Sequence, residues 1–209
     1  FQNKQINKIN IVGGYKIEKL KKYGLPLIYN ENYDSTNMVY SLYKAIDLLK
    51  GNIIISYGDI IYSEETLKTL LNSDGDIVIA SDKNWKSYWS GRMENVLSDV
   101  ESFSTYDKNF VKELGKKPKS LNNIEGQYIG LIKLSAKGSK IMADTLKEGV
   151  FEDDENIWNS GKNFRDAYMT DLLNNFAKNK ILKYCEINRG WFEIDSPSDL
   201  DYCEKEISF

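Results

Sequence analysis

The sequence has 209 residues, a formal net charge of −3, a hydrophobic fraction of 41 % and no histidine. These values fit one globular domain and give no electrostatic reason to expect nucleic acid as a partner. The lack of histidine excludes His-containing catalytic triads and imidazole metal sites, and no apolar stretch approaches the ~20 residues of a membrane-spanning helix.

The first eighty residues alternate between short apolar runs and segments with helical periodicity. Strands are predicted over 6–12, 27–29, 52–57 and 76–80, and helices over 16–23, 36–50 and 64–72, with Ser35 or Thr36 as the cap of the second helix. Because the connections are short and the run 52–57 is continuously apolar, we expect a right-handed parallel α/β sheet covered on both faces. The chain opens on a strand without a Met, so we expect an earlier βα unit to be absent.

Beyond residue 80 this alternation changes. Residues 83–125 form an insertion rich in aromatic and charged side chains, with a predicted hairpin over 103–114. Further strands are predicted over 127–134, 181–187 and 191–195, helices over 136–148, 168–177 and 197–207, and a polar loop over 152–163. Two cysteines, Cys185 and Cys203, lie far apart without metal-binding spacing, which indicates reduced thiols in a cytoplasmic protein.

Two acidic residues follow predicted strands. Asp59 closes the stretch Ser56-Tyr57-Gly58-Asp59, and Asp195 precedes Ser196-Pro197, where a helix begins. Each position alone fits a turn, or a helix cap at Asp195 or Ser196, as well as it fits a ligand. Taken together, two carboxylates at strand ends can hold one Mg²⁺, which prefers carboxylate and phosphate oxygens.

Two other groups of residues are rich in positive charge. The pair Lys116-Lys117 after a strand end fits a solvated surface and also fits a phosphate clamp. The cluster of Lys83, Trp85, Trp89 and Arg92 fits either core packing or a surface that stacks on and neutralises a zwitterionic phosphorylated substrate.

The order of several motifs resembles that in the sugar-phosphate and phosphocholine nucleotidyltransferases. These motifs are Val12-Gly13-Gly14-Tyr15, Asn30, Thr36-Asn37-Met38-Val39-Tyr40-Ser41-Leu42, Ser56-Tyr57-Gly58-Asp59, Lys116-Lys117-Pro118, Tyr128-Ile129-Gly130 and Phe192-Glu193-Ile194-Asp195-Ser196. The resemblance covers essentially the whole chain and rests on the order of the motifs rather than on any single one. It is strongest toward the cytidylyltransferases of phosphocholine, phosphonate and capsule-phosphoramidate pathways. The last of these groups activates phosphoglutamine, and the resemblance to it is clearest in residues 82–90, 113–117 and 127–130.

This resemblance implies a fold and a set of site residues. The fold is a GT-A-type three-layer α/β sandwich around a mostly parallel mixed sheet, with residues 1–209 as a single nucleotidyltransferase domain. A glycine-rich loop that binds the triphosphate, followed by an Arg and a Lys, would precede Phe1 and is not in this sequence. The implied site residues are Asp59 and Asp195 for Mg²⁺, Lys116 and Lys117 for catalysis, Gly14, Thr36, Asn37, Tyr57 and Gly58 for the nucleotide, and Lys83, Trp85, Trp89, Arg92, Glu125, Gln127 and Tyr168 for the acceptor.

The expected activity is Mg²⁺-dependent transfer of a cytidylyl group from CTP to a phosphorylated or phosphonate acceptor, with release of pyrophosphate. Such an acceptor is phosphoglutamine, phosphocholine or aminoethylphosphonate, and the reaction is expected to serve the modification of a surface polysaccharide or capsule. The enzyme is expected to be a cytoplasmic homodimer without nucleic-acid or membrane partners. A phosphate oxygen is ionised at neutral pH and attacks without a general base, which suits a chain without histidine.

Three alternatives remain open from the sequence. A sugar-1-phosphate nucleotidyltransferase shares the metal pair but needs a pocket that recognises hydroxyl groups. A GT-A glycosyltransferase usually carries Asp-x-Asp where this chain has Gly58-Asp59-Ile60-Ile61, which counts against it. A nucleotide-binding relative without turnover is favoured only by the missing glycine-rich loop.

Overall fold

A computed structural model describes residues 5–93, 95–151, 158 and 160–207. By its backbone contacts the chain divides into two compact units, Phe1–Lys50 with Ser139–Leu172, and Gly51–Gly138 with Leu173–Phe209. That the two units together make one nucleotidyltransferase domain stays a prediction. Among these described residues, no helix combines the length and apolar character needed to cross a membrane.

The first unit contains a small parallel sheet. Strands β1 (Ile11–Gly13) and β2 (Leu27–Tyr29) pair in parallel, and the 3₁₀ helix Ile17–Tyr23 connects them. This connection ends at Gly24, where φ is 65°, a left-handed conformation that glycine adopts without a steric cost. The predicted end of the first helix is therefore confirmed, while the first strand is shorter than predicted.

Helix α1 (Met38–Lys44) is also shorter than the predicted 36–50, since a separate 3₁₀ turn follows it at Ile46–Leu48. It begins after Asn37, whose side chain accepts a hydrogen bond from the Met38 N–H at 2.8 Å. The predicted cap, Ser35 or Thr36, is wrong because the Thr36 hydroxyl instead donates to the Asn32 carbonyl oxygen at 2.6 Å. Helix α4 (Ala136–Phe151) includes the predicted range 136–148.

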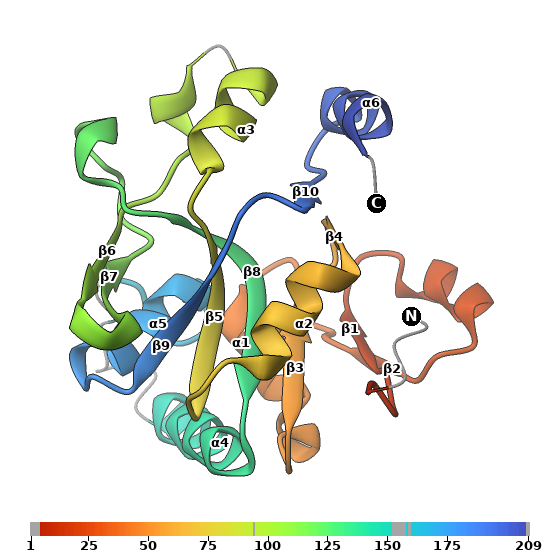
Figure 1. Ribbon diagram of the computed structural model, residues 1–209. Helices are drawn as coiled ribbons and strands as arrows, with labels where there is room; N and C mark the ends of the chain where they lie inside the picture. The colour runs from red at the N-terminus through yellow and green to blue at the C-terminus, as the bar shows by residue number, and fades with distance from the viewer. Residues whose placement is uncertain (1–4, 94, 152–157, 159, 208–209) are drawn as a thin grey trace. The chain divides into compact units, whose positions relative to one another are not determined.

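The second unit is built on a six-stranded sheet. In spatial order its strands are β3 (Ile53–Ser56), β8 (Gln127–Leu134), β5 (Ile77–Asp82), β9 (Leu182–Ile187), β7 (Phe110–Leu114) and β6 (Phe103–Tyr106) (Figure 1). Strands β3, β5, β9 and β6 run in one direction and β8 and β7 in the other, as the pairings between neighbours require. The mixed α/β fold class is confirmed.

The parallel pairing predicted within the first eighty residues is confirmed for β1 and β2 and is wrong for β3 and β5. Strand β8 lies between β3 and β5 and is antiparallel to both, and the parallel pair of the sheet is β5–β9. Strand β5, which has β8 on one side and β9 on the other, is buried along its whole length. The continuously apolar run at 52–57 forms β3 instead, which lies at the edge of this sheet and is only partly buried, so the expectation that this run is covered on both faces is wrong.

Helices cover this sheet. Helix α2 (Glu64–Asn72) contacts β5, β8 and β9 and crosses in front of β5 in Figure 1, with Leu67 and Leu70 buried. The hydroxyl of Ser63 caps it by accepting the Thr66 N–H at 3.1 Å. Helix α5 (Met169–Lys178) is tied to β7, since the Asn174 side chain bonds both the N–H and the carbonyl oxygen of Leu114.

Four short elements gather at one end of this second unit; in Figure 1, α3 and α6 lie at the top, and β10 and β4 lie below α6. They are α3 (Trp85–Arg92), β4 (Ile60–Tyr62), β10 (Trp191–Glu193) and α6 (Pro197–Glu206). Strands β4 and β10 form an antiparallel ribbon in which Ile60 faces Glu193. The sequence did not predict β4, and its pairing with β10 brings the two halves of the candidate site together.

The predicted hairpin is confirmed, with β6 and β7 joined by the 3₁₀ turn Asp107–Asn109.

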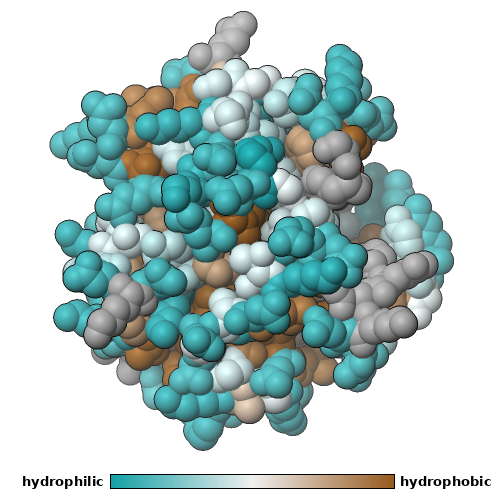
Figure 2. Space-filling view, in the orientation of Figure 1, coloured by the Kyte–Doolittle hydropathy of each residue, from teal (hydrophilic) through white to brown (hydrophobic). Residues whose placement is uncertain are grey.

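Hydrophilic side chains cover much of the molecular face shown in Figure 2. Both cysteines are free and buried, in agreement with the predicted thiols. Most of the predicted loop 152–163 lies outside the described residues.

Candidate active site

Asp59 and Asp195 lie at the same end of the β4–β10 ribbon. Asp59 immediately precedes β4, and Asp195 lies two residues beyond β10. The Ile194 N–H donates to the Asp59 carbonyl oxygen at 2.9 Å, which extends the ribbon by one more bond. The two acids that the sequence separates by more than 130 positions are therefore neighbours.

The carboxylates at this end of the ribbon interact electrostatically. Burial raises the pKa of the Asp59 carboxyl, and the negative charge of Asp195 raises it further. Burial also raises the pKa of Glu193 to about 7, against the opposing hydrogen bond from Arg92, while Asp195 and Asp59 again add repulsion. Negative charge is thus concentrated where a cation would be stabilised.

Arg92 binds three of the surrounding acids. Its side chain is 1 % exposed and donates to Glu193 at 2.8 Å, to Asp195 at 2.5 Å and to Asp199 at 2.7 Å. The hydrogen bond from Arg92 lowers the pKa of Asp199 to about 2. This arrangement differs from the prediction that Arg92 faces an acceptor, because all edges of the buried guanidinium already have carboxylate partners.

The start of α6 fixes the backbone next to Asp195. Ser196 and Asp199 form a reciprocal capping box, with Pro197 in the first turn, so the predicted cap at Ser196 is confirmed. The N–H groups of Asp195 and Ser196 both donate to Asp199 Oδ2, at 3.1 and 2.9 Å. The acid at 199 therefore holds the segment that carries Asp195.

Tyr57 packs into a space that a glycine leaves open. Its N–H donates to the Gly130 carbonyl oxygen at 2.9 Å, and its ring lies edge-on to Tyr128 with centroids 5.8 Å apart. Gly130 has φ of 80°, and a Cβ there would lie 2.6 Å from the Tyr57 ring. Burial raises the pKa of Tyr57, so the phenol stays protonated two residues before Asp59.

The two candidate tryptophans of α3 belong to an aromatic core. Trp85 is 1 % and Trp89 is 4 % exposed, and their rings meet edge-on at 6.2 Å. Trp89 also contacts Trp191 of β10 and donates its indole N–H to Asp99 at 2.9 Å. This differs from the prediction of a substrate-facing cluster, since both rings are covered by protein; helical i, i+4 spacing here indicates packing.

The other acceptor candidates have separate surroundings. Exposed Lys83 pairs with Glu186 at 2.9 Å, and Glu125 accepts from the Thr105 N–H and hydroxyl. The side-chain amide of buried Gln127 accepts a hydrogen bond from the Glu101 N–H and donates one to the Glu101 carbonyl oxygen. Tyr168 belongs to the first unit, where it is 45 % exposed beside Lys162.

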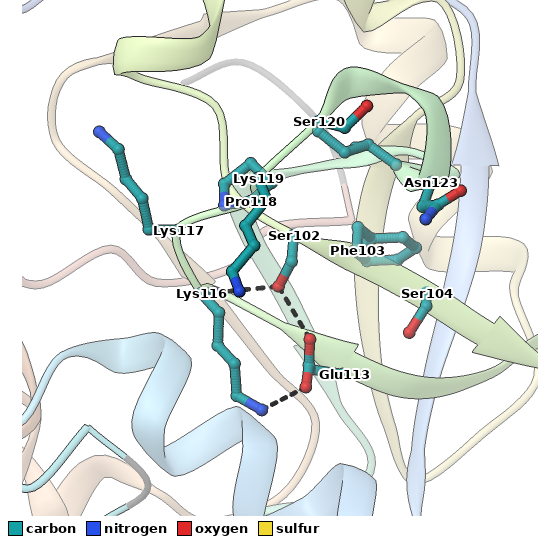
Figure 3. Close-up of a pocket in the computed structure, with 11 residues that line it drawn as sticks. Ser102, Phe103, Ser104, Glu113, Lys116, Lys117, Pro118, Lys119, Ser120 and Asn123 are labelled. Carbon is teal, nitrogen blue, oxygen red and sulfur yellow. Dashed lines mark hydrogen bonds and ion pairs between the residues drawn. The ribbon is translucent and has the colours of Figure 1, made fainter.

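Lys116 and Lys117 border a pocket of about 320 Å³ (Figure 3). Lys116 Nζ pairs with Glu113, which also accepts from the Ser102 hydroxyl at 3.1 Å. Lys117 bonds the Ser98 carbonyl oxygen and points away from Glu113 in Figure 3. The pocket is lined by Ser102, Phe103, Ser104, Glu113, Lys116, Lys117, Pro118, Lys119, Ser120, Asn123 and Ile124.

The nucleotide-binding candidates are divided between the units. Gly58 and Tyr57 belong to the second, and a Cβ at Gly58 would meet no atom within 4 Å. Gly14, Thr36 and Asn37 belong to the first, where the side chain of Asn30, 1 % exposed, donates to the Thr36 hydroxyl at 3.0 Å. A Cβ at Gly14 would lie 2.1 Å from Tyr33, so only glycine fits there.

The donor set at the ribbon end suits a metal ion that also binds phosphate. Within the described ranges, no three or more His, Cys, Asp or Glu side chains are grouped so as to hold a metal by themselves. Mg²⁺ is usually held by one or two carboxylates together with substrate phosphates. The pair Asp59 and Asp195 fits that donor set.

Sequence reasoning missed the residues that support this pair. Glu193 and Asp199 complete the ion-pair cluster around Arg92, and Tyr128 packs against Tyr57. The spacing Ser196-Pro197-Ser198-Asp199 contained a capping signal for Asp199. No local signal linked Arg92 to acids more than 100 positions away.

Comparison with known proteins gives one close relative and a set of fold neighbours. No family model matches the chain. The chain is 37 % identical to a CTP:phosphoglutamine cytidylyltransferase of Campylobacter jejuni over 94 % of this chain and 80 % of the relative. A CTP:phosphocholine cytidylyltransferase of Streptococcus pneumoniae superposes with a TM-score of 0.66 at 20 % identity, covering 97 % and 79 % of the two chains.

A second solved structure has the same fold. The inositol-1-phosphate CTP transferase of T. maritima superposes with a TM-score of 0.62 at 14 % identity, covering 94 % of this chain and 76 % of its own. These two likenesses show the nucleotidyltransferase fold of GT-A type, which confirms the fold expected from the motif order.

Proposed function

The chain belongs to the cytidylyltransferase family of nucleotidyltransferases, and we propose that it transfers a cytidylyl group from CTP to phosphoglutamine with release of pyrophosphate. The observation that carries this proposal is the 37 % identity to the CTP:phosphoglutamine cytidylyltransferase over 94 % of the chain. We place the reaction in the cytoplasm, in the modification of a capsule or surface polysaccharide.

The chemistry requires one bond to form and one to break. An ionised oxygen of the acceptor phosphate attacks the α-phosphorus of CTP, and the bond from that phosphorus to the oxygen bridging to the β-phosphate breaks. The electron pair leaves with pyrophosphate, so no proton needs to be removed from the nucleophile. The protein supplies alignment of the reactants and neutralises the charge on the phosphates.

Nucleotidyltransferases of this family generally use a divalent metal ion, and we propose Mg²⁺ here. Asp59 and Asp195 would hold it, and when bound it would neutralise charge on the phosphates of CTP. Burial raises the pKa of Asp59 and repulsion by Asp195 raises it further, and this repulsion supports a role in cation binding. Their closeness through the Ile194–Asp59 hydrogen bond supports it independently.

The remaining roles are assigned by the chemistry of each side chain. Lys116 and Lys117 would stabilise the acceptor phosphate, and the exposure of the Lys116 side chain, 57 %, leaves its ammonium within reach of a ligand. Gly14, Thr36, Asn37, Tyr57 and Gly58 would contact the nucleotide. Of the acceptor candidates, Lys83, Glu125, Gln127 and Tyr168 remain in the proposal, whereas Trp85, Trp89 and Arg92 have roles inside the protein.

A substrate panel tests the proposal. The purified full-length protein is incubated with Mg²⁺, one of CTP, UTP, ATP or dTTP, and one of phosphoglutamine, phosphocholine, phosphoethanolamine, 2-aminoethylphosphonate or glucose-1-phosphate. Pyrophosphate release is measured, and the cytidine diphosphate product is identified by ³¹P NMR. We expect the highest kcat/KM with CTP and phosphoglutamine. A preference for glucose-1-phosphate, or no pyrophosphate from any pair, would contradict it.

A further inference from the structure

We propose that Arg92 is a positioning residue, which orients the carboxylate of Asp195 toward a divalent metal ion. The inference rests on the metal-binding role of Asp195 in the proposed function. It assigns to Arg92 a task within the reaction although its guanidinium is covered by protein and has no surface for the acceptor.

The contacts of Arg92 fix its guanidinium from several sides. Nε and NH2 both donate to Asp199, at 2.7 and 3.2 Å, and NH1 donates to Glu193 at 2.8 Å. The ring of Tyr88 lies 5.8 Å from the guanidinium carbon. With these groups held, NH2 has one direction left in which to donate, and Asp195 Oδ2 accepts there at 2.5 Å.

The two carboxylate oxygens of Asp195 differ in their hydrogen bonding. Oδ2 is bound by Arg92, while Oδ1 accepts no hydrogen bond from the described residues, and 51 % of the side chain is exposed. Its backbone is fixed separately, since its N–H donates to Asp199 at 3.1 Å. One oxygen is therefore anchored to the protein, and the other is left for a ligand.

The positioning role and a purely electrostatic role of Arg92 predict opposite results. If Arg92 acted only as a positive charge, its replacement by a neutral residue would remove repulsion and strengthen the binding of a cation. If it orients Asp195, both Gln and Lys weaken binding, because neither reproduces the planar fork that reaches three acids at once. The sign of the change in metal affinity separates the two roles.

Arg189 provides a matched control in the same neighbourhood. Its guanidinium lies 4.1 Å from the centre of the Tyr88 ring and pairs with the fully buried Asp82 at 2.8 Å. It also donates to the Trp191 carbonyl oxygen. It shares the aromatic surroundings and the carboxylate partner of Arg92 but does not contact Asp195.

The test is direct binding of Mn²⁺, measured by the electron paramagnetic resonance signal of the free ion, on the wild type and on Arg92→Lys, Arg92→Gln, Arg189→Lys and Asp195→Asn. Residues that orient a metal ligand typically change metal affinity by about 10- to 100-fold when replaced, so we expect about a tenfold loss for both Arg92 variants. Arg189→Lys should stay within about twofold of the wild type, since its contacts do not reach the metal ligands. Circular dichroism checks that each variant is folded.

Other outcomes would overturn the inference. Arg92 variants with unchanged or tighter Mn²⁺ binding exclude a positioning role, and equal losses in Arg92→Lys and Arg189→Lys indicate general loosening of the unit. If neither Arg92 variant folds, Glu193→Gln takes their place, because it weakens the NH1 contact of Arg92 and leaves the bond from the Asp195 N–H to Asp199 in place; unchanged binding there also overturns it. If Asp195→Asn binds Mn²⁺ like the wild type, the metal role fails first and the inference fails with it.

Discussion

The backbone N–H of Ile194 donates to the carbonyl oxygen of Asp59 at 2.9 Å, and this bond closes the end of the β4–β10 ribbon where the acids meet. The flanking positions are held by neighbouring contacts, Tyr57 by Gly130 and Asp195 by Arg92 and Asp199. The site is thus organised by backbone pairing and by charge, and both can be altered one residue at a time.

Gly130→Ala should disturb the site through Tyr57. Alanine at φ of 80° costs about 1–2 kcal/mol, and its Cβ would lie 2.6 Å from the Tyr57 ring, which must then move. We expect a lower Tm and a higher KM for CTP. Gly51→Ala is the control, since φ is 81° there and a Cβ would meet no atom within 4 Å. Equal effects of the two variants on the KM would show that the contact with Tyr57 does not matter.

Trp85→Ala should unfold the protein more easily without a specific effect on the acceptor. The ring is 1 % exposed, and removal of a buried tryptophan typically costs about 3–5 kcal/mol. Urea unfolding measures this loss, and Lys83→Ala, at an exposed position next to α3, should change stability by less than about 0.5 kcal/mol. A Trp85 variant of normal stability with a raised KM for the acceptor would restore the substrate-facing assignment.

The lysines at the pocket should matter for catalysis more than for stability. Loss of a group that stabilises charge in the transition state typically lowers the rate by about 10²–10³-fold, which we expect for Lys116→Met or Lys117→Met. Tm should hardly change because both ammonium groups lie on exposed side chains. Lys68→Met on α2, where the lysine forms an exposed pair with Glu64, is the control. Normal kcat/KM in both pocket variants would remove these lysines from the mechanism.

Cys185 should be unreactive in the folded protein. Burial raises the pKa of its thiol to about 11, so almost no thiolate exists at pH 8. The stabilisation from the neutral buried thiol is complete below the unfolded pKa and is lost as the pH rises toward 11. We expect a chromogenic disulfide reagent to label Cys185 only after urea is added, as shown by mass spectrometry of the labelled peptide. Rapid labelling in the native state would show that the thiol is accessible.

The sequence predicted the elements better than their arrangement. The apolar runs at 52–57 and 76–80 correctly indicated strands, because consecutive β-branched apolar residues leave a local signal. The strand β8 was predicted at 127–134, but its position between these two strands was not, since an antiparallel strand between them leaves no trace in either run. The three-residue strand β4 was missed because it is too short for any periodicity.

Only those parts of the site that leave a pattern in the local sequence could be predicted. Asp59 and Asp195 stand out as acids after strands, and their closeness agrees with the motif order. The partners of Arg92 are set by tertiary packing over more than 100 positions, so the sequence offered only its charge and its tryptophan neighbours. That composition fits a substrate pocket and an aromatic core equally well, and the structure shows the core.

The most direct test compares pyrophosphate release from CTP and phosphoglutamine by the full-length wild type, Asp59→Asn and Asp195→Asn. Each substitution preserves size and removes one charge, so we expect kcat/KM to fall by at least about 10²-fold, with native circular dichroism. Asp76→Asn, which removes an exposed pair with Lys137 at the start of β5, should keep full activity. Wild-type turnover in both Asp59→Asn and Asp195→Asn would contradict cytidylyl transfer at this pair of carboxylates.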